Sequence, residues 1–250
     1  MGIALWALAA ALVVGLGIAV VVFVRAGGRG RGDGESPVIR VAFWVALLWA
    51  GIAIVGALVT IVSTLVQSAV QITVPTAEYW PMLPEGAFIE GASATRTGGG
   101  FTAADVTVEG LSLGARVCWA VGQALWWLVP GAVAAMVALS CLQLMRGRAF
   151  APVLSRMSMV TAAVVCFGGI AAQVLSDIAG SMASTELLSY SGGGYDEVAG
   201  IDDVLDAWWP DAVFSVTLPF WPIAAGLAFA ALAVILRNGT RLQRDTEGLV

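Results

Sequence analysis

Long apolar segments constrain the fold of this chain more than any other feature of its sequence. The segments are Ile3–Val24, Val41–Leu65, Val117–Leu144, Met157–Ile178 and Ala212–Leu236. Each reaches the roughly 20 residues that an α-helix needs to cross about 30 Å of hydrocarbon. A backbone in lipid must satisfy its own hydrogen bonds, so we expect helices here. The sequence therefore predicts an all-α integral membrane protein, a bundle of five transmembrane helices.

The composition supports this class and excludes several kinds of site. Apolar residues make up 59% of the chain and charged residues 12%, whereas a soluble domain carries about a quarter charged residues. Histidine, the commonest proton carrier and metal ligand, is absent from the chain. Cys118, Cys141 and Cys166 all fall in apolar segments, without the spacing of a zinc site or of a disulfide framework. We therefore expect no metal and no cofactor.

The arginines predict the orientation in the membrane. They lie after the first segment, around the gap between the third and fourth, and in the C-terminal tail: Arg25, Arg29, Arg31, Arg40, Arg146, Arg148, Arg156, Arg237, Arg241 and Arg244. Basic residues favour the cytoplasmic side, and the opposite gaps hold acids with only Arg96 and Arg116. The absence of lysine is typical of a GC-rich bacterial genome. We expect a bacterial plasma membrane, with the N-terminus outside and the C-terminus in the cytoplasm.

The chain divides into an N-terminal part and a larger membrane domain. Residues 1–37 hold the first helix and a Gly/Arg-rich cytoplasmic linker, and residues 38–250 hold the other four helices. The first apolar segment has no basic region before it, so we expect a span that stays attached rather than a cleaved signal peptide.

Two regions on the predicted outer side, residues 68–115 and 183–211, are long enough to fold. In the first, β-branched residues recur in Val70–Val74 and Ala103–Val108, with prolines and glycines between them. This pattern predicts a small hairpin-like β cap. In the second, apolar residues share one helical face: Val198, Ile201, Val204, Leu205 and Trp208. They predict a short amphipathic helix at the membrane interface.

Charged residues and prolines in the apolar segments are the first candidate functional residues. Arg116 opens the third segment, and Asp177 lies near the outer end of the fourth, so we expect them to pair at the outer rim. We expect this pair to be structural, because a transport path needs charge deeper in the membrane. Pro219 and Pro222 interrupt the last segment and predict a kink, which is either a hinge or an ordinary feature of a bundle helix.

Trp126 and Trp127 lie deeper than the usual aromatic belt of a membrane protein. They either pack between helices or line a cleft of lipid or quinone size. Gln173 is a candidate for a hydrogen bond between helices.

Motifs of catalysis are missing from the sequence. It has no nucleophile elbow, no phosphate-binding glycine loop and no metal-ligand cluster, so we expect no catalytic residues and no enzyme. The acidic run Asp196–Asp211 lacks the spacing of a calcium loop. The Gly/Arg tract Gly27–Pro37 is too short for a nucleic-acid-binding tract.

Two stretches carry a family resemblance. They are LQLMRGRAFAP at Leu142–Pro152, leading through Arg156 into the next span, and the charged ending Leu236–Val250. With the order of spans, they resemble the bacterial membrane proteins grouped as domain of unknown function 2975. The resemblance covers about Val38–Val250, and the first helix is additional to it. It implies four spans, an outer loop after the first of them, and membrane-linked regulation, without known catalytic residues.

Gly147, Phe150 and Pro152 match the inner turn of that family. The physical roles of these residues are also clear without the resemblance. Gly147 allows a tight turn at the end of the third span, Phe150 packs at the interface, and Pro152 starts the next helix.

These observations predict a non-enzymatic accessory or regulatory membrane protein. Its partners would be the lipid bilayer and a membrane protein partner, or a second copy of the chain, and no nucleic acid. The alternative is a small transporter, channel or lipid-handling protein. That alternative predicts a cavity near Trp126, Trp127 and Gln173.

Overall fold

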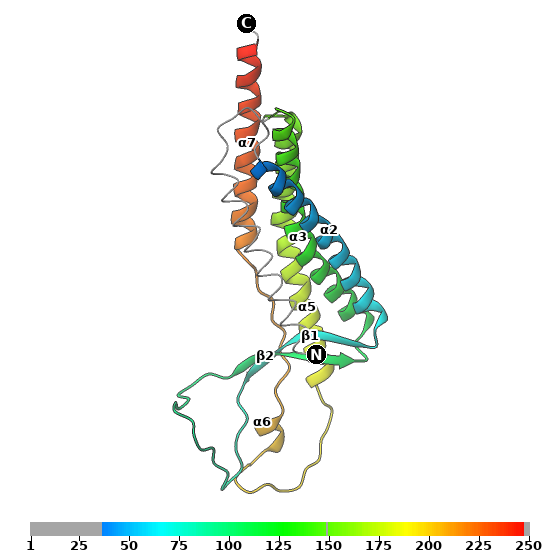
Figure 1. Ribbon diagram of the computed structural model, residues 1–250. Coiled ribbons are helices and arrows are strands. Elements are labelled where there is room, and N and C mark those ends of the chain that lie inside the picture. The colour runs from blue at the N-terminus through cyan, green and yellow to red at the C-terminus, as the bar shows by residue number, and fades with distance from the viewer. Residues whose placement is uncertain (1–36, 149, 248–250) are drawn as a thin grey trace. The chain divides into compact units, whose positions relative to one another are not determined.

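The structure, a computed structural model, describes residues 37–148 and 150–247. The predicted first span, Ile3–Val24, lies outside these residues. Within them, four helices are long and apolar enough to cross a membrane (Figure 1). They are α2 (Pro37–Val66), α3 (Leu113–Met145), a continuous helix over Pro152–Leu188, and α7 (Trp221–Glu247). The described part of the chain is thus mostly helical, with one small sheet.

The helices α2 and α3 confirm that the apolar segments Val41–Leu65 and Val117–Leu144 are helical and of membrane-spanning length, and they extend both segments. The Pro152–Leu188 helix consists of α4 (Pro152–Ala163), a π-helical turn η1 (Val164–Gly168) and α5 (Gly169–Leu188). It contains the predicted span Met157–Ile178 and continues past it. The extra length of α5 supports the sheet described below.

The chain forms two compact units, which we describe separately. Of the described residues, unit 1 comprises 37–55, 128–148, 150–166 and 221–247, and unit 2 comprises Gly56–Trp127 and Phe167–Phe220.

In unit 1, α4 and α7 pack closely through small residues. The hydroxyl of Ser158, which is fully buried, donates a hydrogen bond to the carbonyl oxygen of Phe229 at 2.7 Å. A Cβ atom on Gly226 would lie 2.8 Å from the Cβ of Cys166. Only glycine permits this approach, because real Cβ contacts are essentially never that short.

The turn that ends α3 in unit 1 confirms the predicted roles of Gly147 and Pro152. Gly147 has φ of 70°, and its N–H donates to the carbonyl oxygen of Leu144 at 3.0 Å. The N–H of Arg148 donates to the carbonyl oxygen of Gln143 at 2.9 Å. These two bonds satisfy free carbonyls at the helix end, as in a Schellman motif. Pro152 occupies the first turn of α4, where its missing N–H costs little.

Unit 2 contains the predicted β cap. The strands β1 (Ala69–Tyr79) and β2 (Phe101–Glu109) pair antiparallel, with an irregularity between Pro75 and Tyr79. Both predicted strands, Val70–Val74 and Ala103–Val108, are therefore confirmed and longer than expected. Side chains alternate between the two faces of a strand, so one face of β1 is apolar and the other polar.

The apolar face of the sheet packs on the end of α5. Val70, Ile72 and Val74 are buried in one core cluster with Ala179 and Ala183 of α5. Between those alanines lies Gly180, where an added Cβ would sit 2.5 Å from the carbonyl oxygen of Thr73. Small residues on α5 thus let the strand backbone lie directly against the helix (Figure 1).

The last predicted span, Ala212–Leu236, is wrong at its N-terminal end. The helix α7 begins only at Trp221, so Pro219 precedes it and Pro222 is its second residue. A proline in the first turn lacks an N–H that would be free in any case. The two prolines therefore set the start of α7, and the predicted kink within the span does not occur.

The chain before α7 is instead extended and lies along α5 in unit 2. Alternate backbone N–H groups of this segment donate to side-chain oxygens one turn apart on α5. The pairs are Val213 with Ser184 at 3.1 Å, Ser215 with Ser181 at 3.0 Å, and Thr217 with Asp177 at 2.7 Å. A helical turn rises about 5.4 Å and two extended residues about 6.6 Å, so the two repeats are close enough for three successive bonds.

The predicted amphipathic helix in unit 2 is shorter than expected. The helix α6 covers only Val204–Trp208. Before it, Val198 and Ile201 form an isolated bridge around Gly200, which has φ of 81°. The carboxylate of Asp203 caps the helix by accepting from the backbone N–H groups of the first turn. The positive φ of Gly200 and this cap delay the start of the helix.

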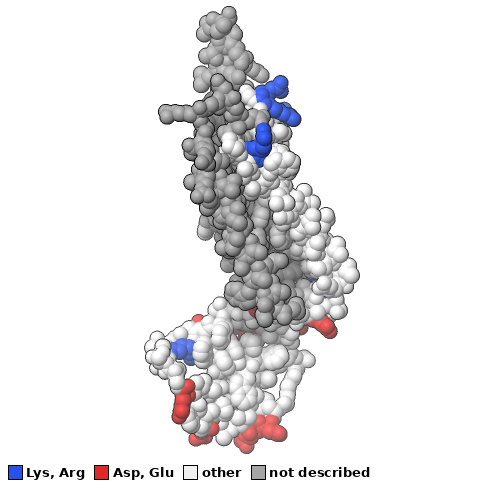
Figure 2. All heavy atoms as spheres, in the orientation of Figure 1, with Lys and Arg blue, Asp and Glu red and all other residues white. Residues whose placement is uncertain are grey.

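The two units carry charge of opposite sign (Figure 2). The described side chains of unit 1 include arginines and no acid: Arg40, Arg146, Arg148, Arg156, Arg237 and Arg241. Unit 2 holds the acids of the two loop regions, with Arg96 and Arg116 as its arginines. The segregation of charge expected from the sequence thus coincides with the division into units.

Candidate functional site

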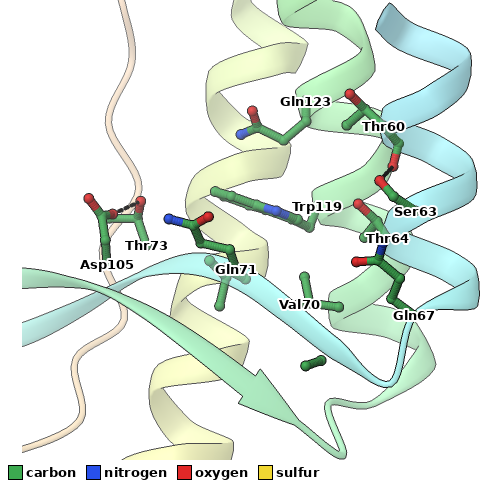
Figure 3. Close-up of a pocket in the computed structure, with 12 residues that line it drawn as sticks. Thr60, Ser63, Thr64, Gln67, Val70, Gln71, Thr73, Asp105, Trp119 and Gln123 are labelled. Atoms are coloured by element: carbon green, nitrogen blue, oxygen red, sulfur yellow. Dashed lines mark hydrogen bonds between the residues drawn. The ribbon is translucent and has the colours of Figure 1, made fainter. Parts of the chain in front are cut away.

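Unit 2 contains a pocket of about 550 Å³ where the sheet faces the ends of α2 and α3 (Figure 3). Its walls are mostly amide and hydroxyl side chains. From α2 come Thr60, Ser63, Thr64 and Gln67, from the sheet Gln71, Thr73 and Asp105, and from α3 Trp119 and Gln123. Ala69, Val70 and Ile72 of β1 also line the pocket, and the indole of Trp119 is its largest apolar side chain. The chemistry suits a ligand with several hydrogen-bonding groups and a flat or apolar part.

The alternation of side chains along β1 explains why the sheet contributes polar side chains to this pocket. Val70 and Ile72 point into the core, so Gln71 and Thr73 lie on the opposite, exposed face. Thr73 lies opposite Asp105 in the hairpin, and its hydroxyl donates to the carboxylate at 2.6 Å. The register of the hairpin thus places a carboxylate in the pocket and holds it there.

A second pocket of about 440 Å³ adjoins the first and shares Thr73, Trp119 and Gln123 with it. It lies toward α5 and the extended segment, and Gln173 and Asp177 line it. The side-chain amide of Gln123 donates to the hydroxyl of Ser176 of α5 at 3.4 Å. Trp119 and Gln123 therefore lie between the two polar pockets.

Asp177 is bound by neutral donors rather than by an arginine. One carboxylate oxygen accepts from the backbone N–H of Thr217 at 2.7 Å and from its hydroxyl at 2.6 Å. The other accepts from the side-chain amide of Gln173 at 2.7 Å. The predicted Arg116–Asp177 pair is therefore wrong, because the extended segment supplies the partners of the carboxylate.

Arg116 instead closes the end of α2. Its guanidinium group donates to the carbonyl oxygens of Gln67 and, at 2.9 Å, of Ser68. A cation at a helix C-terminus is favourable, because the last carbonyls carry partial negative charge. The Nε atom of Arg116 is buried and has no hydrogen-bond partner among the described residues.

The two tryptophans singled out from the sequence do not line either of these pockets. Trp127 packs on α2, where a Cβ on Gly56 would lie 2.7 Å from its ring. Trp126 and Trp127 are each 37% exposed. Of the three residues predicted to line a cavity, Gln173 lines the second of these pockets, and Trp119 supplies an aromatic side chain there.

The turn residue Phe150 packs within unit 1. A Cβ on Gly239 of α7 would overlap the phenyl ring of Phe150, so the ring lies directly on the helix backbone. The hydroxyl of Thr240 donates to the carbonyl oxygen of Phe150 at 2.8 Å. Phe150 thus joins the α3–α4 turn to α7.

The outer edge of β2 is a further candidate surface. The sheet has two strands, and α5 and the extended segment cover the β1 side, where Thr76 bridges to Ala212. Within residues 37–148 and 150–247, no segment pairs with the other edge of β2. Side chains of β2 are mostly exposed and include the acids Asp105 and Glu109. An edge strand of this kind presents unpaired N–H and C=O groups.

Sequence reasoning missed the most specific features of unit 2. Ser181 and Ser184 are fully buried and polar, yet serines in an alanine-rich helix give little signal by themselves. The spacing of Asp177, Ser181 and Ser184 was a usable signal, because it places all three polar side chains on one side of α5. In the part of the chain that the structure describes, no group of three His, Cys, Asp or Glu side chains is placed to hold a metal ion.

Comparison of the chain with protein-family models, with curated proteins and with solved structures gave no match. The resemblance to domain of unknown function 2975 therefore stays a prediction.

Proposed function

We propose that this chain is a multi-pass integral membrane protein that acts as a non-enzymatic accessory or regulatory protein, binding an extended segment of a partner protein along β2. Unit 2 faces the outside of the cell, and the arginine-bearing end of unit 1 faces the cytoplasm of a bacterium.

The helix surfaces support insertion in a membrane. Large apolar side chains of α2 are exposed along its length, with Trp44 at 62%, Leu48 at 66% and Val59 at 60%. A helix that exposes apolar residues on most sides is unfavourable in water and favourable in lipid. The arginines of unit 1 and the acids of unit 2 agree with the positive-inside rule for the orientation proposed here.

The free edge of β2 is the single observation on which the partner hypothesis depends. Adding a strand to an exposed sheet edge is a common way to bind a peptide, because backbone hydrogen bonds supply affinity. The hairpin stays ordered without such a partner, because its apolar face is buried on α5. The carboxylates on β2 favour a partner segment with basic residues over an acidic one.

Hydrogen exchange tests this proposal directly. Alternate N–H groups of β2 point away from β1, so they should exchange quickly in the purified chain and slowly in a complex isolated in mild detergent. The β1 amides that pair with β2 are the internal control, because they are hydrogen-bonded with and without a partner. The variant Glu109→Lys should weaken co-purification of the partner, whereas Glu90→Lys in the exposed loop should not. A chain that purifies alone, with equally fast exchange of β2 in native membranes, contradicts the proposal.

The adjoining polar pockets favour a second candidate function, the handling of a small polar solute or a lipid headgroup. Their amide and hydroxyl lining matches such ligands, and Gln123 belongs to both pockets. In liposomes, the variant Gln123→Leu should reduce uptake of such a solute. Thr107→Val, an exposed β2 residue outside both pockets, is the matched control. Wild-type protein with no solute binding and no flux eliminates this function.

A further inference from the structure

Unit 1 contains a pocket of about 660 Å³ between the first turns of α4 and the C-terminal half of α7. Arg156 of α4 and Arg237 and Arg241 of α7 line it together. The two arginines of α7 are four residues apart and therefore lie on one helical face. Met159 and Val234 line the part of the pocket toward the apolar stretches of the two helices. The pocket thus has a cationic end and an apolar end.

The two helices that form this pocket are fixed relative to each other. The hydroxyl of Ser155 donates to the carbonyl oxygen of Ala233 across the helix pair at 3.0 Å. On the other side, Thr240 bonds to the carbonyl oxygen of Phe150, whose ring packs on Gly239. The arginines therefore extend from a rigid frame, which lowers the entropic cost of ligand binding.

Among the residues of unit 1 whose side chains the structure describes, no acid accompanies the arginines of the pocket, and Asp245 and Glu247 follow only in the last turns of α7. Residues 37–55, 128–148, 150–166 and 221–241 contain no Asp and no Glu. The N-terminus of α4 also points to this region, and Ala151 provides no side-chain cap there. The positive end of the helix dipole adds to the potential of the three guanidinium groups.

We propose that this pocket binds the headgroup of an anionic phospholipid. Guanidinium groups match phosphate oxygens in pairs, and three of them from two helices surround a single phosphodiester. The apolar end, with Met159 and Val234, accommodates the first carbons of the acyl chains. A free phosphate ion gains nothing from that end, so the lipid is the occupant. This inference rests on the proposed membrane insertion, and it is independent of the protein partner.

Native mass spectrometry of the full chain, released from detergent with added lipid, tests the site. Phosphatidylglycerol should bind more tightly than phosphatidylcholine. Arg156→Gln and Arg237→Gln should each weaken phosphatidylglycerol binding by about fivefold, as expected for one arginine near an anionic lipid. Arg237→Lys keeps the charge but loses the paired donors of the guanidinium group, so it should weaken binding less than Arg237→Gln does. Arg148→Gln removes a charge of unit 1 outside the pocket and should leave binding unchanged.

Four results overturn the proposal. Equal weakening by Arg148→Gln means that the attraction is a general surface effect. Competition by inorganic phosphate at the concentration of the lipid means that the site takes a free anion. A chain that shows no preference for phosphatidylglycerol has no lipid site of this kind. If that chain also stays in membranes during alkaline extraction, the proposed membrane function still stands. Release by alkaline extraction refutes the membrane function itself, so the two failures are distinguishable. Circular dichroism confirms that each variant is folded.

Discussion

Removal of the Asp177 carboxylate should destabilise unit 2, because this group holds the extended segment before α7 on α5. The carboxylate accepts from the N–H and hydroxyl of Thr217 and from the amide of Gln173, all at 2.6 to 2.7 Å. In Asp177→Ala, all of these donors lose their acceptor. In Asp177→Asn, one oxygen remains, and the amide of Gln173 can turn to present its own oxygen.

The magnitude follows from the partners and their exposure. A hydrogen bond to a charged group contributes about 1.5–3 kcal/mol. Thr217 is exposed, so water replaces part of what the carboxylate supplies. We therefore expect Asp177→Ala to lower the free energy of unfolding by about 2–3 kcal/mol, and Asp177→Asn by about 1 kcal/mol. Asp196→Ala, in an exposed loop of unit 2, should stay within about 0.5 kcal/mol of wild type.

Urea unfolding in mild detergent, followed by tryptophan fluorescence, measures these differences. A double-mutant cycle with Thr217→Val isolates the bond between the carboxylate and the hydroxyl, and we expect a coupling energy of about 1 kcal/mol. Equal stability of Asp177→Ala and Asp196→Ala refutes the reasoning. So does a cycle with no coupling, because the segment is then held by other contacts.

Three further substitutions test the packing and the helix ends. Gly180→Ala forces its Cβ against the carbonyl oxygen of Thr73, so the free energy of unfolding should fall by about 2 kcal/mol. Its control is Gly51→Ala, which has open space around it and should be neutral or stabilising. Gly147→Ala places a side chain at φ of 70° and should cost about 1–2 kcal/mol in the same urea assay. Arg116→Met removes the donors at the end of α2. Hydrogen exchange should then become faster in the last turn of α2 and in the first residues of β1. Unchanged exchange contradicts the capping role of Arg116.

Local patterns in the sequence were sufficient for much of the fold. Apolar length predicted α2, α3 and the Pro152–Leu188 helix, because hydrocarbon-length segments without charge have few other stable conformations. Alternation of β-branched residues predicted the hairpin, and glycine and proline predicted the turn from Gly147 to Pro152. Each of these features depends on residues that are close together in the chain.

The same local argument explains the errors. The residues from Ala212 to Phe220 are apolar enough to read as part of a span, yet they are extended. Their backbone groups bond to serine and aspartate side chains on α5, so an extended conformation is satisfied without a helix. The partner of Asp177 was wrong for this reason, because the competing donors come from a segment 40 residues away.

The sequence by itself determined which segments are long and apolar, which of the connections between them are basic and which acidic, and where the hairpin and the inner turn lie. Only the tertiary structure decided how α5 supports the sheet and the extended segment, and which polar side chains meet in the pockets. Hydropathy, charge and turn chemistry act over a few residues and are visible in order along the chain. The pairing of Asp177 with Thr217, or of Thr73 with Asp105, depends on register between distant segments, which is set only when their backbones pack.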